Sequence, residues 1–406
     1  MTENISSYPS AESGRNREDV RGHNLSVILR SVHTNGEVTR SQLASGTGLN
    51  RSTILTLVAE LVERGLVLSE EATSASGVGR PSHLVLPSPD VISLVVHTEV
   101  DAITVGAVTL GGRVLAKHRD PVHTAPSPEK SVELAAARIE QLRRELPPQA
   151  RVVGIGVAVP GQVRAADGVV RYAPHLGWNE VPYSAMLGQA TGLPVEIDND
   201  ASIGCTAEYT FGSARGFNNI VYLFAGSGGI GGGVIIDGAR LRGVAGYAGE
   251  LGHVRISSST KPDYSGLTGT IEALVQRDEL LDALKLFGAT DEELQVEAKS
   301  KSAKSSVVAN LIRGQIDSLS IGLANFVNIF NPNAIILDGF LGTLFDFDEQ
   351  RLINGIRTAS LAASSERLVI RKGKLGSDLL MVGGAELAFN RLLSAPAETE
   401  LHPIRR

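Results

Sequence analysis

Apolar residues near the N-terminus recur at helical spacing. Positions three or four apart from Val20 to Val32 predict a helix that ends at Asn35-Gly36, where the glycine is a C-cap signal. Thr39 and Gln42 then form a capping box, which opens a short second helix. The chain therefore begins its ordered part with two helices in close succession.

A longer third helix is expected after the glycine turn Gly46–Gly48. Asn50 is its predicted N-cap, and the helix extends from Arg51 to about Arg64. Its apolar stripe is expected to consist of Ile54, Leu57, Val58, Leu61 and Val62. The segments Leu66–Leu68 and Leu84–Leu86 follow and predict a β-hairpin.

This order of elements is that of a winged helix-turn-helix, a DNA-binding domain. The positions expected to contact DNA carry short donors and acceptors or arginine, and they are Thr39, Arg40, Asn50, Arg51, Ser52, Thr53 and Thr56. Arg80, next to Pro81 at a stiffened loop tip, is expected to enter a minor groove. A small helical protein-interaction module has a similar periodicity, so spacing alone leaves that alternative open.

Strand patterns replace helical ones after the linker Pro87–Pro89. Three segments predict an antiparallel meander: Val91–Val96, Ile103–Leu110 and Val114–His118. A helix over 129–145 and a buried strand over Val152–Val159 follow. A strand over Val195–Ile197 and a helix over 201–213 complete this lobe.

A similar order recurs from about residue 214. Two strands joined by the turn Asp237-Gly238 lead to a third strand that contains Leu241. Helices are expected over 269–287, 291–299, 305–330, 349–362 and 378–393. Two lobes, each with a meander followed by α/β crossovers, indicate a two-lobed actin-like, sugar-kinase ATPase fold, in which ligands lie between the lobes.

The chain is therefore expected to hold three parts: a disordered leader over 1–18, a winged helix-turn-helix domain over 19–88 and a two-lobed α/β domain over 89–406, with lobes of about 89–213 and 214–394. Hydrophobic residues make up 42% of the 406 positions, and no apolar run is long enough to span a bilayer. We therefore expect a cytoplasmic protein with no membrane partner. The single cysteine, Cys205, excludes an intrachain disulfide and a multi-cysteine zinc site.

The octapeptide Gly246–His253 carries the most specific chemistry. Its three glycines permit tight turns, and Glu250 and His253 are spaced to point into one cavity from a single turn. A carboxylate accepts hydroxyl protons and an imidazole donates or accepts one, so the pair suits a polyhydroxylated small molecule. Taken alone, the octapeptide is equally compatible with a glycine-rich surface turn.

Four motifs in order resemble the ROK family of bacterial sugar kinases and sugar-responsive repressors. They are Gly154–Gly161, Ile197–Ala201, Gly228–Gly233 with Asp237-Gly238, and Gly249–His253. The resemblance covers the chain from Val91 onward, and the N-terminal domain is similar to that of the repressor branch. It implies a sugar-binding site formed by Gly161, Asn199, Asp200, Glu250, His253 and Glu272. Asp200 stands where the kinases of the family have their catalytic base.

Departures from the family pattern argue against nucleotide binding. Glu99 and Val100 stand where glycines of the first phosphate loop expose N–H groups, and His97 replaces an aspartate that organises Mg²⁺. Gly228 replaces a threonine common in kinases, and Asp338 a glycine of the adenosine side. We therefore expect ATP and Mg²⁺ binding to be weak or absent and kinase activity to be lost.

The resemblance also aligns Asp263, Ser265 and Thr270 with three cysteines that, together with a histidine, hold a structural zinc in relatives. Without thiolates a tetrahedral zinc site is implausible, so no metal or other cofactor is expected. His253 is then free of a zinc-binding role, and hydrogen bonds and packing must hold the loop.

Together these features predict a sugar-responsive transcription regulator, in the first instance a repressor of carbohydrate uptake or catabolism genes. Its expected partners are operator DNA, a small sugar effector and further copies of itself in a homodimer or homotetramer. Two alternatives stay open: an ATP-dependent sugar kinase with an attached DNA-binding domain, and a DNA-binding protein whose larger domain only oligomerises. The sequence leaves open whether the sugar releases or promotes DNA binding.

Overall fold

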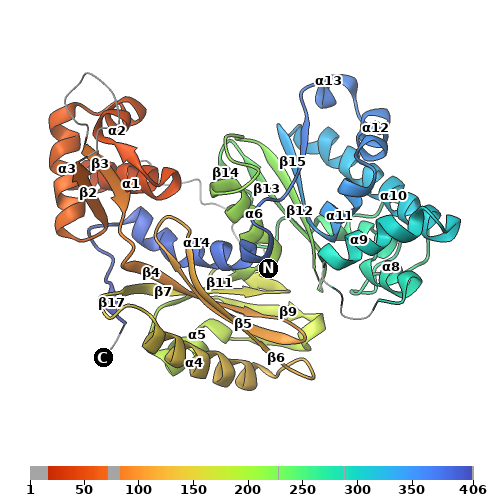
Figure 1. Ribbon diagram of the computed structural model, residues 1–406, viewed down its shortest axis with the longest axis horizontal. Coiled ribbons are helices and arrows are strands. Elements are labelled where there is room, and N and C mark those ends of the chain that lie inside the picture. Colours follow the sequence, from red (N-terminus) through yellow and green to blue (C-terminus); the bar gives the residue numbers. More distant parts are fainter. Residues whose placement is uncertain (1–16, 72–82, 227, 287–288, 290, 405–406) are drawn as a thin grey trace, which may run out of the picture. The chain divides into compact units, whose positions relative to one another are not determined.

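The computed structural model describes residues 17–71, 83–226, 228–286, 289 and 291–404, and the chain divides into two compact units. The first unit comprises Met1–Ser88 and Asn390–Glu400, and the second comprises Pro89–Phe389 and Leu401–Arg406. The C-terminal helix α14 (Leu379–Ser394) therefore starts in the second unit and ends in the first (Figure 1). The helical spacing that predicted this helix gave no sign of that division.

The first unit contains the predicted three helices and hairpin. Its elements are α1 (Arg17–Asn35), β1 (Val38–Thr39), α2 (Arg40–Thr47), α3 (Arg51–Glu63), β2 (Val67–Glu71) and β3 (His83–Pro87). The strands form an antiparallel sheet in the order β1-β3-β2. Both predicted N-caps are confirmed, because Thr39 accepts a hydrogen bond from the Gln42 N–H and Asn50 accepts one from the Thr53 N–H.

Two details of this unit differ from the prediction. Helix α1 begins at Arg17, inside the expected leader, and Glu18 and Asp19 in its first turn favour the positive end of the helix dipole; residues 1–16 lie outside the described residues. Val62 is 39% exposed. Val62 directly follows Leu61 on the helix, so its side chain points in a different direction around the helix axis and lies beside the apolar stripe rather than in it.

The end of α14 is bound to α1 and α3 within the first unit. The buried Ser26 hydroxyl donates to the Leu393 carbonyl at 2.6 Å. Arg64, directly after α3, donates to the Ala397 carbonyl at 3.1 Å. These side chains satisfy carbonyls that a helix end and the following turn leave without intrahelical partners.

The first lobe of the second unit is built on a mixed sheet in the order β11-β7-β4-β5-β6, with β17 (His402–Pro403) added beside β7. Its strands are β4 (Val91–Thr98), β5 (Ala102–Thr109), β6 (Val114–Pro121), β7 (Arg151–Val159) and β11 (Val195–Asn199). Helices α4 (Pro128–Glu145) and α5 (Tyr183–Thr191) cover one face (Figure 1). On the other face, a Cβ at Gly156 would lie 1.7 Å from the Gly384 carbonyl, so this strand and α14 pack in backbone contact.

A small antiparallel sheet beside this lobe was not predicted. It has the order β10-β9-β8 and consists of β8 (Gln162–Arg164), β9 (Val169–Ala173) and β10 (Trp178–Val181), with η1 (Pro174–Leu176) in between. Its strands are too short to give a reliable period of two. Its first strand, β8, begins at Gln162, directly after Gly161, so this sheet positions Gln162 at the site.

The second lobe is a five-stranded sheet in the order β14-β13-β12-β15-β16. Its strands are β12 (Ile220–Gly226), β13 (Gly229–Ile236), β14 (Ala239–Arg240), β15 (Ala334–Gly339) and β16 (Val369–Lys372). Helix α6 (Asp200–Thr210) packs on one face. The other face is covered by a larger core to which α10 (Ser306–Phe330), α11 (Phe340–Phe347) and α12 (Glu349–Ala359) contribute. The remaining short elements are η2 (Leu251–His253), α9 (Asp291–Ser302), α13 (Ala362–Ser365) and η3 (Gly376–Asp378).

The helix predicted over 269–287 is wrong as a single element. It is two helices, α7 (Ile271–Leu274) and α8 (Arg277–Leu284), with an extended break at Val275 and Gln276. The Gln315 side chain donates to the Gln276 carbonyl at 2.9 Å and so replaces a helical hydrogen bond there. Leu241 also lies one residue beyond β14, although its N–H still donates to the Val234 carbonyl.

Within the described residues, none of the helices combines the length and the apolar composition needed to cross a bilayer.

Candidate functional site

Asn199 and Asp200 lie where β11 ends and α6 begins. The Asn199 side chain caps α6 by accepting from the Ser202 N–H at 3.1 Å, and its amide donates to the Gly161 carbonyl at 3.1 Å. A Cβ at Gly161 would lie 2.7 Å from the Tyr172 carbonyl, so only glycine fits this turn. The predicted residues Gly161, Asn199 and Asp200 are therefore brought together at one end of the sheet.

The Asp200 carboxyl is held in a setting that favours its neutral form. Burial, with a further contribution from the nearby charges of Glu250 and Glu99, raises its pKa to about 7 despite a hydrogen bond from the Ala201 N–H. At neutral pH the group is able to accept or donate a proton. Both roles suit a hydroxyl ligand.

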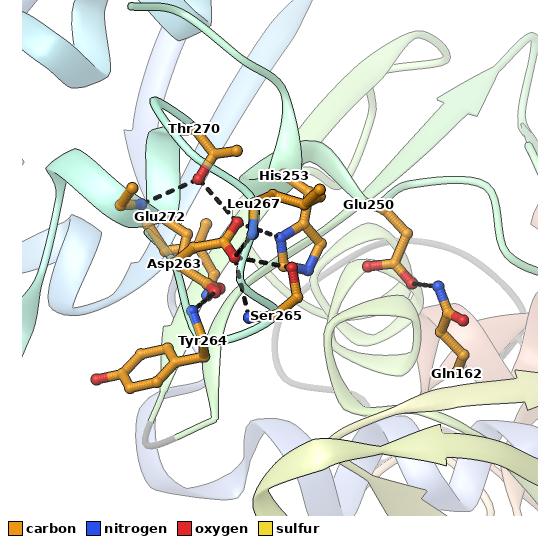
Figure 2. Close-up of polar contacts among 11 residues, drawn as sticks. Gln162, Glu250, His253, Asp263, Tyr264, Ser265, Leu267, Thr270 and Glu272 are labelled. Carbon is orange, nitrogen blue, oxygen red and sulfur yellow. Dashed lines mark hydrogen bonds and ion pairs between the residues drawn. The ribbon is translucent and has the colours of Figure 1, made fainter. Parts of the chain in front are cut away.

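Glu250 precedes the single turn η2, and His253 is its last residue. The Gln162 amide donates to a Glu250 carboxylate oxygen at 3.2 Å, and His253 Nδ1 lies 2.9 Å from an Asp263 oxygen (Figure 2). Burial lowers the pKa of His253, but the hydrogen bond to Asp263 and the surrounding carboxylates outweigh it and raise the pKa overall. With Nδ1 donating to Asp263, Nε2 is the ring atom left for a ligand.

Glu272 is placed by α7 against the glycine-rich strand β13. One oxygen accepts the Ile230 N–H at 2.6 Å and the other the Tyr264 N–H at 3.4 Å. The side chain is almost fully buried, and burial raises its pKa. Glu272 therefore ties the loop at residue 264 to β13, in addition to any contact with a ligand.

Three of the six predicted site residues line two separate pockets, and Gly161, Asp200 and His253 line neither of them. Asn199 and Glu250 line one, together with Gln162, Ser202 and Tyr247, which were not predicted. Glu272 lines the other. Gln162 could have been identified by its position directly after the Pro-Gly turn. Tyr247 could have been identified by its place inside the octapeptide Gly246–His253, which first indicated the site.

Glycines of the Gly228–Gly233 motif and of the 249–253 turn are used for packing. A Cβ at Gly233 would lie 2.5 Å from the Cβ of Cys205 on α6, and one at Gly252 would lie 2.0 Å from the Ile230 carbonyl. Glycine therefore lets α6 and the 249–253 turn both approach β13 closely. Cys205 is completely buried, and burial raises the pKa of its thiol to about 12.

The segment aligned with the first phosphate loop is closed by its own contacts. The Glu99 N–H donates to the Ala102 carbonyl at 2.9 Å, and the Glu99 carboxylate accepts from Thr104 and Arg119 at 3.1 and 3.3 Å. Arg119 also pairs with Asp101 at 2.9 Å. His97 is largely buried, which lowers its pKa. Two carboxylates, those of Glu99 and Asp101, therefore meet the Arg119 guanidinium at this turn.

The surface expected to contact DNA is partly occupied by local hydrogen bonds. The Thr39 and Asn50 oxygens cap helices, and Thr56 donates to the Ser52 carbonyl at 3.1 Å. Arg40 donates to the Ser69 hydroxyl at 3.0 Å on β2. The exposed residues at the start of α3 are Asn50, Arg51 and Ser52, followed by Leu55 and Thr56, whereas Thr53 is half-buried. Arg80 lies outside the described residues.

A two-lobed sugar-kinase-like domain joined to a winged helix-turn-helix defines the architecture of this protein. The ROK family model matches residues 96–391, and the chain belongs to the ROK family.

Both repressors and sugar kinases are among the relatives of this chain. The chain is 29% identical over 391 residues to the xylose repressor of Caldicellulosiruptor bescii, which covers 92% of this chain and 97% of that protein. It is 28% identical over 308 residues to the glucokinase of Streptomyces coelicolor, which covers 70% of this chain. Among solved structures, a ROK family transcriptional regulator described as a homologue of the E. coli MLC protein matches 93% of this chain with a TM-score of 0.75 at 23% identity. The match to the ROK hexokinase of Thermus thermophilus covers 74% with a TM-score of 0.61.

Proposed function

We propose that this protein is a sugar-responsive transcription repressor that no longer phosphorylates its sugar. One observation carries the proposal: the chain joins a winged helix-turn-helix to a domain with a pocket lined by amide, hydroxyl and carboxylate groups, while the turn at Glu99 carries two carboxylates. An added negative charge at this turn repels the phosphates of ATP. A site that holds the sugar without transferring phosphate is suited to sensing.

The effector we propose is a small neutral sugar. The pocket at Asn199 and Glu250 offers amide, hydroxyl and carboxylate groups, which hydrogen-bond sugar hydroxyls. Xylose is the first sugar to test, because several relatives of about the same length are described as xylose repressors. A hexose and an N-acetyl sugar complete the panel.

The proposed DNA complex is a dimer on a palindromic operator, with α3 in the major groove. Sugar binding would change the relative stability of two conformers of the second unit and thereby the operator affinity. A difference of about 1.4 kcal/mol in sugar affinity between the conformers shifts their ratio about tenfold.

The decisive experiment combines calorimetry with an operator gel shift. We expect at least one sugar of the panel to bind without ATP, and to alter operator affinity. Glu250→Ala should keep the operator affinity of the sugar-free protein and lose the sugar response, whereas Arg51→Ala should weaken operator binding. A sugar response that survives Glu250→Ala would remove this pocket from the proposal.

A sugar kinase with an attached DNA-binding domain is the second candidate. Asp200, with a pKa of about 7, is suited to take a proton from a sugar hydroxyl. Measurable sugar phosphate formed by the purified protein with ATP and Mg²⁺ would establish this candidate instead.

A further inference from the structure

The loop from Asp263 to Thr270 is organised around a single carboxylate. One Asp263 oxygen accepts from the Ser265 hydroxyl at 2.7 Å, the Ser265 N–H at 2.9 Å and the Leu267 N–H at 3.0 Å. The other accepts from the Thr270 hydroxyl at 2.8 Å and lies 2.9 Å from His253 Nδ1 (Figure 2). The Asp263 side chain is completely buried.

Four residues donate to this carboxylate. His253 comes from η2, Ser265 and Leu267 come from the turn that Asp263 begins, and Thr270 is the N-cap of α7. Thr270 accepts the Ala273 N–H at 3.1 Å while it donates to Asp263, so it joins the carboxylate to α7. Figure 2 shows Glu272 on this helix beside the cluster.

The residues present do not fit the structural zinc of the family. The positions aligned with its three thiolates carry one carboxylate and two hydroxyls, which are hard oxygen donors. Both carboxylate oxygens already accept two or three hydrogen bonds, and the Ser265 and Thr270 hydroxyls donate their protons to them. A cation would have to displace these bonds.

We propose that Asp263 takes over the role of that zinc as the positioning residue of the sugar site. It is not a ligand of the sugar: it holds His253 by Nδ1, which fixes the ring orientation and leaves Nε2 for a ligand, and it fixes the start of α7, which carries Glu272. The effect of Asp263 on sugar binding rests on the proposed function, whereas the arrangement of the loop can be tested without a sugar.

Hydrogen-bond chemistry explains why an acid is required at this position. An ionised carboxylate has only acceptor sites, so it satisfies five donors at once. A metal ion accepts no hydrogen bonds and would hold the loop through its ligands instead. These bonds lower the pKa of Asp263 although burial acts in the opposite direction. An asparagine would turn an N–H₂ group toward two of the five donors.

The first test is a double-mutant cycle on sugar binding in the full-length protein. Asp263→Asn should weaken binding of the panel sugar about tenfold or more, since it leaves buried donors unpaired. His253→Gln should weaken it as well, and the loss in the double variant should be smaller than the sum of the two single losses, because Asp263 acts partly through the histidine and partly through α7. Additive losses would overturn the proposal. Asp317→Asn is the matched control, since this exposed carboxylate accepts hydrogen bonds from Arg351 at 2.6 Å and lines neither pocket.

The second test restores the metal. A variant with Asp263→Cys, Ser265→Cys and Thr270→Cys should bind about one zinc per chain together with His253, which a colorimetric chelator titration measures. Zinc should raise its unfolding temperature and return its sugar affinity toward that of the original protein. A triple variant that folds but takes up no zinc, or whose zinc leaves sugar binding and unfolding unchanged, would overturn the proposal.

The two proposals fail in different ways. If the original protein binds none of the sugars, the proposed function fails. Zinc uptake by the triple variant and the accompanying rise in its unfolding temperature still decide whether residues 253, 263, 265 and 270 converge as inferred. If Asp263→Asn does not fold, the zinc-loaded triple variant supplies the sugar measurement.

Discussion

Replacing Asp200 by asparagine should reveal how strongly the site disfavours a charged carboxylate. The pKa of Asp200 is raised from 3.8 to about 7, chiefly by burial and then by the charge of Glu250. A shift of about 3 units corresponds to about 4 kcal/mol. Because the residue is only partly buried and water reaches it, we expect about half of this free energy to be measurable.

The sign of the effect follows from proton binding. Between pH 4 and pH 7 the folded protein keeps a proton on Asp200 that the unfolded chain releases, so the free energy of unfolding falls as the pH rises. Asp200→Asn lacks this titration and keeps an acceptor for the Ala201 N–H. The variant should match the original protein near pH 4 and be more stable by about 2 kcal/mol at pH 8.

The protein carries a suitable probe for this measurement. Its single tryptophan, Trp178, is 2% exposed and lies in the second unit, so its fluorescence during urea unfolding follows that unit alone. Asp167→Asn is the control of opposite sign, because the hydrogen bond from Arg164 lowers the pKa of Asp167 on the surface. A stability difference between Asp200→Asn and the original protein that does not change with pH would refute the reasoning.

Three further substitutions test packing and helix capping in the two units. Glu208→Gln should cost about 3 kcal/mol in urea unfolding, since the buried carboxylate accepts backbone N–H groups of Ser213, Lys374 and Leu375 and the amide opposes one of them. Gly252→Ala should cost about 1–3 kcal/mol and weaken sugar binding in calorimetry, because its Cβ would lie 2.0 Å from a backbone oxygen. Thr39→Ala should lower the protection of α2 amides in hydrogen exchange by about 1 kcal/mol, through loss of the N-cap.

Controls for these variants come from the same chain. Gly46→Ala adds a methyl group with no atom within 4 Å inside a helix, so it should be neutral or stabilising. A Gly252→Ala protein as stable as Gly46→Ala would contradict the close packing of β13. Unchanged exchange of α2 in Thr39→Ala would show that Gln42 alone is able to hold the helix start.

The sequence alone determined the features that depend on neighbours along the chain. The caps at Thr39 and Asn50 were predictable because a capping side chain bonds a backbone group two or three residues away. The meander of β4, β5 and β6 followed from short apolar, β-branched runs and a Gly-Gly turn. The family motifs likewise gave the fold and the candidate residues of the site, since each motif is contiguous.

The tertiary structure alone decided the features that depend on residues far apart in sequence. The break between α7 and α8 comes from Gln315, nearly forty residues away, and local spacing carries no sign of it. The end of α14 joins the first unit through Ser26 and Arg64. Asp263 is a polar residue of a loop when seen in sequence. Three of the five donors to its carboxylate lie on Ser265 and Leu267, within four residues of it. Thr270 and His253 lie seven and ten residues away, and the turns of the folded loop bring them to the same carboxylate without leaving a periodic pattern in the chain.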